Sequence, residues 1–319
     1  MRAATSPGAA PAVSTAVPVH LVELDVDAPG WREALTRALA EAGDRDVDVR
    51  LFARAPEALA APVAALAGHR VVRLGATATG TQVSEPGHIA ALAAAAAAAG
   101  IRAELVAGAR SHFTEVNRRL ADLPATGALA FALTPGAHDL ERAQLVESIA
   151  MQRLVATQAA ATGRPVHVGP VTVRPRYLTF AARPLPAPEP GIGYLVAPDA
   201  DDPRQTSPAL AAWTVASAAA LAVDGVASIA YFETWGPRGV RAADGAPYPV
   251  AGAIEALAAL AGSERLAADG ILPPDVWIAA GRRDGVDTVL IANLAARDTR
   301  VAFRDGRTVA VPALAYVRV

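Results

Sequence analysis

Short apolar runs alternate with longer segments rich in Ala, Leu, Arg and Glu over most of the chain. The short runs contain many β-branched residues and have the length of strands, whereas the longer segments have the composition of helices. The predicted strands are 20–26, 47–53, 70–76, 102–107, 128–133, 165–173 and 228–233. The predicted helices are 31–42, 56–66, 87–99, 114–123, 140–161, 207–223 and 251–260.

Strands that alternate with helices predict a parallel sheet, because each right-handed crossover returns the chain to the next strand in the same direction. No glycine-rich phosphate-binding turn follows strand 20–26, so a dinucleotide-binding sheet lacks its main support. We therefore expect an α/β fold with a TIM (β/α)8-like barrel. Seven strands are visible where eight are needed, so either the first strand is missing or disguised in the N-terminal segment, or the barrel is incomplete.

Three further segments interrupt this pattern. Residues 1–17 are rich in Ala, Ser, Thr and Pro, and we expect them to be disordered. Residues 183–208 are rich in Pro, Gly and Asp and are expected to form a long active-site loop. Short strands with tight turns fill residues 271–319, which predicts a small antiparallel β-domain behind a catalytic barrel of residues 18–270.

The composition of the chain excludes several kinds of catalytic and binding site. The 319 residues include no lysine and no cysteine, which excludes Schiff bases, thiolate nucleophiles and thiolate metal sites. The net charge of −2 gives no single-sign field for nucleic acid or a membrane surface, and no histidine spacing predicts a metal or another cofactor. The N-terminus has no apolar stretch of the kind found in secretory signals, so a cytoplasmic location is expected; the oligomeric state stays open.

Candidate catalytic groups should follow the strands, because barrel active sites lie at the carboxyl ends. Glu233 ends the last predicted strand, where alternation places it on one face with Tyr231. Trp235 follows closely, and we expect both aromatic residues to bind substrate. The alternative is a glutamate paired with a barrel arginine for stability. Glu115 follows strand 102–107, and two carboxylates so placed could face each other across the mouth. Its alternative is an ordinary first-turn acid of a helix capped by Thr114.

Three basic side chains also follow strands. His138 lies in a loop beside Asp139 and could act as an oriented base, or simply start a helix. Arg174 and Arg176 flank a proline after strand 165–173 and could bind a carboxylate or sugar hydroxyls, or be solvated.

Several motifs occur together in one order. They are Phe113-Thr-Glu-Val-Asn-Arg118, Thr134-Pro-Gly-Ala-His-Asp139, Leu145-Val-Glu-Ser148, Val168-Gly-Pro-Val-Thr-Val-Arg-Pro-Arg176, Asp202-Pro-Arg-Gln205, Ala212-Trp213 and Tyr231-Phe-Glu-Thr234. In this order they resemble the D-apionate lactonase family, from about residue 20 to residue 250. The chain is similar to a divergent or N-terminally truncated member, without the family's N-terminal β-domain and first barrel strand.

The resemblance implies a barrel like that of clan A glycoside hydrolases and a reaction that opens a branched-sugar lactone. Carried over by motif, the pocket comprises Glu115, Asn117, His138, Arg174 and Glu233. We assign Glu233 as base or nucleophile and Glu115 as general acid, with the others orienting the substrate or stabilising charge. Two alternatives stay open: a retaining glycosidase that uses the same two glutamates, and a carbohydrate-binding barrel without catalysis.

Overall fold

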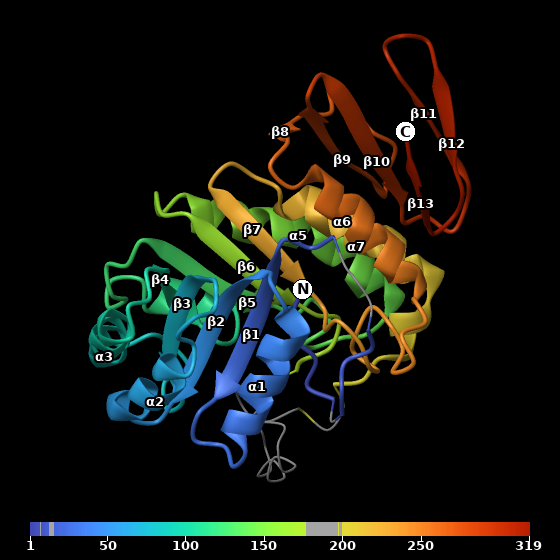
Figure 1. Ribbon diagram of the computed structural model, residues 1–319. Coiled ribbons are helices and arrows are strands. Elements are labelled where there is room, and N and C mark those ends of the chain that lie inside the picture. Colours follow the sequence, from blue (N-terminus) through green and yellow to red (C-terminus); the bar gives the residue numbers. More distant parts are fainter. Residues whose placement is uncertain (7, 13–15, 177–196, 198–199) are drawn as a thin grey trace.

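The computed structural model describes residues 1–6, 8–12, 16–176, 197 and 200–319. Seven parallel strands form one curled sheet in which their order in space equals their order in sequence (Figure 1). They are β1 (Val19–Asp25), β2 (Asp46–Ala53), β3 (Val71–Ala78), β4 (Glu104–Ala109), β5 (Ala128–Leu133), β6 (Val166–Val171) and β7 (Val226–Tyr231). The predicted α/β fold is therefore confirmed, with a TIM-like barrel wall.

Helices cover the outside of this wall, because each crossover carries the chain back along the apolar outer face of the sheet. They are α1 (Trp31–Ala42), α2 (Ala60–Ala64), α3 (Pro86–Ala98), α4 (Phe113–Arg118), α5 (Arg142–Ala160), α6 (Pro208–Leu221) and α7 (Pro249–Leu260), with short 3₁₀ turns at Pro56–Leu59 and Pro203–Thr206. No helix in the described ranges combines the length and apolarity needed to cross a bilayer.

Residues 1–3 bridge β1 to residues 232–234, just beyond the carboxyl end of β7, and so supply the disguised strand at that end of the barrel only. On one side, the amide of Ala3 donates to Leu21 and the amide of Leu21 donates to Met1, both at 2.8 Å. On the other side, the amide of Arg2 donates to Phe232 at 2.9 Å, and Thr234 donates to the carbonyl of Arg2 at 3.0 Å. The expected disorder of residues 1–17 is therefore wrong for this segment, because its backbone groups complete the barrel ladder.

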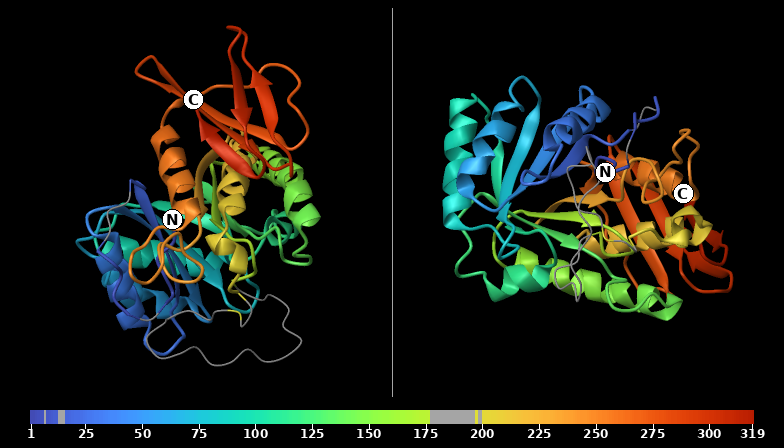
Figure 2. Two further views of the ribbon diagram at one scale, coloured as in Figure 1. Left: turned by 90° about the vertical axis from the view of Figure 1, so that its right-hand side faces the viewer. Right: turned by 90° about the horizontal axis from the view of Figure 1, so that it is seen from below.

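Two small antiparallel sheets follow the barrel. The first has the order β13-β10-β9-β8, and the second is a hairpin of β11 and β12. These strands are β8 (Glu264–Arg265), β9 (Val276–Arg283), β10 (Val286–Asn293), β11 (Thr299–Ala302), β12 (Thr308–Val311) and β13 (Ala315–Arg318). Apolar residues of β9 and β10 join the core cluster of α6 and α7, so the sheet packs on that flank of the barrel (Figure 2). β8 comes before residue 271 but pairs with β9 of the antiparallel sheet. The predicted domain boundary between residues 270 and 271 therefore stays a proposal.

Candidate functional site

Glu233 lies just beyond the end of β7 and is almost completely buried, with 1% of its surface exposed. Its Oε1 accepts hydrogen bonds from Arg2 Nη1 at 2.9 Å, from Thr5 Oγ1 at 2.7 Å and from Arg238 Nε at 3.1 Å. Its Oε2 accepts from the amide of Thr5 at 3.1 Å. The carboxylate is thus held between two guanidinium groups, which compensates the loss of hydration of its charge.

Simple alternation fails at the end of β7. Phe232 has a φ of +40°, a conformation that is rare for a bulky side chain and interrupts the strand. As a result Tyr231 does not share the face of Glu233. Its hydroxyl donates to Ser217 of α6 at 2.7 Å, in the core between sheet and helices, and burial raises the pKa of Tyr231. Tyr231 is therefore turned away from Glu233 toward α6, although it also borders a separate cavity of about 410 Å³.

Replacement of Tyr231 by phenylalanine tests this placement. The variant loses the hydrogen bond to Ser217 but keeps the ring, so it should unfold about 1 kcal/mol more easily, with turnover unchanged. Urea denaturation and a turnover assay on the same preparation measure both quantities. A large loss of turnover with unchanged stability would instead assign Tyr231 to the substrate.

A row of alternating charges continues from Glu233 into the barrel. Arg2 also contacts Glu23 of β1, with Nε 2.9 Å from Oε2. Arg176 also binds the carboxylate of Glu23: its Nε donates to Oε2 at 2.9 Å and its Nη2 donates to Oε1 at 2.5 Å. Burial alone would raise the pKa of Glu23, but Arg176 and Arg2 outweigh it and hold the pKa at about 2. Arg176 is therefore buried in the barrel interior, where it binds Glu23, and is not a solvated side chain.

Arg174 lies beside this row and is partly exposed. Its Nε donates to Asp202 at 3.2 Å, and Asp202 also binds Arg204. Together with Arg176, Arg238 and Glu233, Arg174 lines a small cavity of about 20 Å³. That volume holds a water molecule but no sugar. Most of the predicted loop 183–208 lies outside the described residues.

Glu115 and its neighbours form a second group at the mouth. The hydroxyl of Ser111 donates to Glu115 at 3.0 Å. Burial lowers the pKa of His112, Arg176 lowers it further, and Glu115 opposes them, so these groups lie within electrostatic reach of one another. His112 and Asn117 line a cavity of about 340 Å³ between α4 and α5, whereas His138 is exposed.

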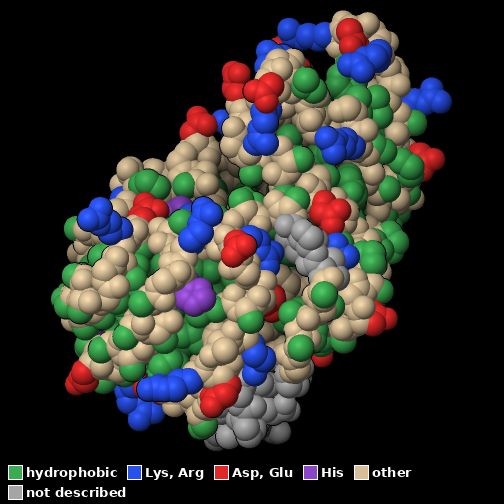
Figure 3. Space-filling view, viewed as in Figure 1, with side chains coloured by type: hydrophobic (Ala, Val, Ile, Leu, Met, Phe, Trp, Pro, Cys, Tyr) green, Lys and Arg blue, Asp and Glu red, His purple; other side chains and the backbone are tan. Residues whose placement is uncertain are grey.

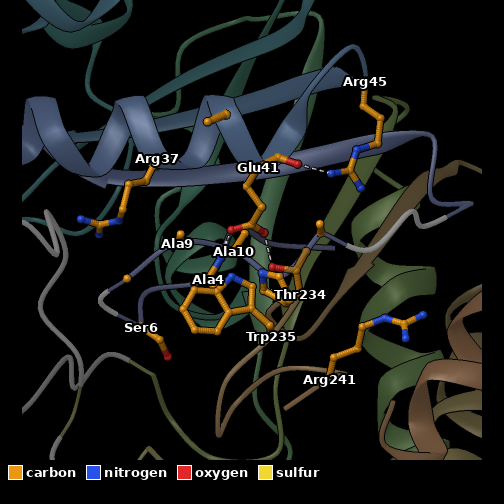
Figure 4. Close-up of a pocket in the computed structure, with 14 residues that line it drawn as sticks. Ala4, Ser6, Ala9, Ala10, Arg37, Glu41, Arg45, Thr234, Trp235 and Arg241 are labelled. Atoms are coloured by element: carbon orange, nitrogen blue, oxygen red, sulfur yellow. Dashed lines mark hydrogen bonds between the residues drawn. The ribbon is translucent and has the colours of Figure 1, made fainter. Parts of the chain in front are cut away.

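Trp235 lines a different cavity, of about 450 Å³, between α1, the segment 4–12 and the residues after β7 (Figure 4). Glu41 of α1 points toward Thr234 there and accepts a hydrogen bond from its hydroxyl. Burial raises the pKa of Glu41, although hydrogen bonds from the hydroxyl of Thr234 and the amide of Ala4 oppose that shift.

The structure thus brings Arg174, Arg176 and Glu233 together and places Glu115, Asn117, His138, Tyr231 and Trp235 elsewhere around them. Sequence reasoning missed the partners of Glu233, which are Arg2, Thr5 and Arg238. It also missed Glu23, although a glutamate between Val22 and Leu24 in a predicted buried strand is a usable signal.

Neither a cluster of metal ligands nor a charged surface patch stands out in the described part of the chain. Among the residues that the structure describes, no three His, Asp or Glu side chains gather as metal ligands would. On the face shown in Figure 3, acidic and basic side chains are interspersed over both the barrel and the C-terminal sheets.

Two solved structures have a similar fold. A glycoside hydrolase family 30 endoxylanase from Clostridium papyrosolvens C71 aligns with a TM-score of 0.55 at 9% identity, covering 93% of this chain and 87% of that one. A family 30 subfamily 8 xylanase from Clostridium acetobutylicum aligns with a TM-score of 0.53 at 9% identity and the same coverage. No curated protein matches the sequence.

A family comparison matches most of the chain. Residues 2–262 match the TIM-barrel domain of D-apionate lactonase. The match begins within the closing strand and ends just after α7, so it spans the whole barrel, including Glu233 and all its partners. The resemblance drawn from the motifs is thereby confirmed, and the chain belongs to the D-apionate lactonase family.

Proposed function

We propose that this chain hydrolyses a sugar-derived lactone of the D-apionolactone type, in carbohydrate catabolism. A carbohydrate-active hydrolase follows from the family; the lactone and the mechanism are the proposal. The observation that carries it is the buried carboxylate of Glu233, held at the end of β7 beside a water-sized cavity lined by arginines. A cytoplasmic location stays a prediction.

Glu233 suits the role of base. Its Oε1 already accepts three hydrogen bonds, but its Oε2 accepts only that of the Thr5 amide among the described contacts. Oε2 therefore retains a lone pair for a water molecule in the adjoining cavity. The water would lose its proton to Glu233 as its oxygen attacks the acyl carbon.

The cationic side chains and Glu115 supply the remaining roles. Arg174 and Arg238 line the same water-sized cavity, so the lactone would bind outside it, where the partly exposed Arg174 would stabilise the oxyanion of the tetrahedral intermediate. Collapse of that intermediate breaks the ring ester bond, and the released alkoxide takes a proton to give the free hydroxy acid. Glu115, which like Arg176 acts electrostatically on His112, is the proposed proton donor.

Glu233→Gln tests the assignment. The variant should lower kcat on D-apionolactone by about 100- to 10,000-fold, because the amide cannot accept the proton of water. Released acid is titrated over a panel of γ-lactones, and rates are normalised to the folded fraction measured by circular dichroism. Glu57→Gln, at an exposed glutamate, is the matched control. Absence of turnover by the wild-type protein across the panel would refute the proposed function.

The retaining glycosidase receives less support. The family match is to a lactonase, and double displacement needs the two carboxyl groups about 5–5.5 Å apart, whereas Glu115 bonds to Ser111 and Glu233 bonds to Arg2, Thr5 and Arg238. Aryl glycosides in the same panel, with mass spectrometry for a glycosyl adduct on Glu233, test that chemistry. Saturable sugar binding without hydrolysis would favour the non-catalytic barrel.

A further inference from the structure

A hydrogen-bonded row of three side chains crosses the barrel interior near the amino-terminal ends of the strands. His167 of β6 lies between them: its Nδ1 is 2.7 Å from Ser228 Oγ of β7, and its Nε2 is 3.2 Å from Glu104 Oε2 of β4. Glu233 belongs to the other end of β7, so this row is separate from the site described above.

The strands themselves place the row. His167 and Ser228 are paired in the parallel register of β6 and β7, so their side chains point to the same side of the sheet. The neutral tautomer that serves both contacts carries its proton on Nε2, donates it to Glu104 and accepts from the serine hydroxyl at Nδ1. Burial lowers the pKa of His167, and Arg73 lowers it further, which keeps the ring neutral and able to accept a proton at neutral pH.

Ser228 is accessible because the closing strand is short. Residues 1–3 pair with residues 232–234, so within the described part of the chain the edge of β7 itself pairs only with β6. A cavity of about 410 Å³ follows this open edge and reaches Ser228. Val19, Ile229 and Leu257 are among the apolar residues that line it, and Ser228 is only half-buried.

One cation faces the same cavity. Arg73 of β3 lines it, and its Nε lies 2.8 Å from Asp48 Oδ2. Arg50 contacts the same aspartate, so the charged groups around His167 are Arg73, Asp48, Arg50 and Glu104. A guanidinium that lines the same cavity as the serine, although Asp48 lines it too, could stabilise negative charge that develops on an acyl oxygen.

We propose that Ser228, His167 and Glu104 form a nucleophilic triad and a second, esterase-type site for esters with a small apolar acyl group. Ser228 Oγ attacks the acyl carbon as its proton passes to His167 Nδ1. The tetrahedral intermediate expels the alcohol, which takes that proton and leaves an acyl group on Ser228. Water then attacks the acyl-enzyme with the same assistance from His167, which releases the carboxylic acid and restores the serine. Glu104 acts as a positioning residue that fixes the tautomer.

The test uses the full-length protein with a fluorophosphonate probe and p-nitrophenyl butyrate. The probe should label one serine, mapped to Ser228 by mass spectrometry, and butyrate hydrolysis should show a burst of nitrophenol. Ser228→Ala should abolish both signals. Ser263→Ala, at a half-buried serine with no histidine partner among the described contacts, should leave them unchanged.

Glu104→Gln and Glu233→Gln complete the design. Glu104→Gln should slow labelling about 10- to 100-fold and shift the pH–rate midpoint downward, because His167 loses a neighbouring negative charge. A purely structural glutamate would leave that midpoint in place. Glu233→Gln should keep full labelling at Ser228, which separates this site from the lactone site. Labelling that persists in Ser228→Ala, or folded wild-type protein without label at Ser228, would overturn the proposal.

Discussion

Replacement of Arg2 by alanine is expected to lower the free energy of unfolding by about 3–5 kcal/mol, the usual cost of breaking a buried ion pair from one side. Arg2 is 2% exposed and contacts both Glu233 and Glu23. Its removal leaves each carboxylate with one guanidinium fewer in a site without room for much water. The same residue carries the backbone hydrogen bonds to Phe232 and Thr234, which the variant keeps.

Chemical denaturation, followed by circular dichroism, measures this loss. Arg300→Ala, at an exposed arginine of β11, should change the free energy of unfolding by less than about 0.5 kcal/mol. Arg2→Met keeps side-chain volume and should still lose most of the stability, which assigns the effect to charge rather than packing. Equal stability of Arg2→Ala and wild type would mean that residues 1–3 do not close the barrel in solution.

The regular part of the fold could be predicted from the chain because its signal is repeated. The predicted strand 128–133 coincides with β5, and the predicted helix 31–42 coincides with α1. Both are apolar or amphipathic over enough residues for periodicity to show, and both are buried by neighbours of the same kind.

Residues 1–3 gave no such signal. A strand of three residues has no period, and its pairing depends on Leu21 and Phe232, which are far away in sequence. The face of Tyr231 was predicted wrongly for a related reason. Alternation holds only in regular strand geometry, and the positive φ of Phe232 interrupts it before Glu233.

The sequence alone identified Glu233 of the candidate site but not the side chains that bind it. The end of a barrel strand marks Glu233 as notable without a structure, and the structure does bury it there. Its partners come from the closing segment and from the loop after β7, which no spacing rule connects. By contrast, Glu23, Asp48 and Arg73 interrupt apolar strands, so polar residues within predicted core strands could have identified a charged barrel interior.

Glu23 provides the second large expected effect. Glu23→Gln should destabilise the protein by about 3 kcal/mol at neutral pH, which corresponds to the fall of its pKa from 4.5 to about 2. The amide cannot match the two-pronged contact of Arg176 or balance the charge of Arg2. Glu57→Gln, at an exposed glutamate, should have little effect at any pH.

The pH dependence separates this electrostatic cause from simple loss of packing. Because the pKa of Glu23 is lower in the folded state, its stabilising contribution is complete above about pH 4.5 and is lost as the pH falls toward 2. The difference in stability between wild type and Glu23→Gln should therefore shrink steadily over that interval. Asp48, whose pKa is also held at about 2, is common to both proteins and cancels in the comparison. Denaturation midpoints measured from pH 7 to pH 2.5 give the difference, and a constant gap over the whole range would show that the charge of Glu23 does not stabilise the barrel.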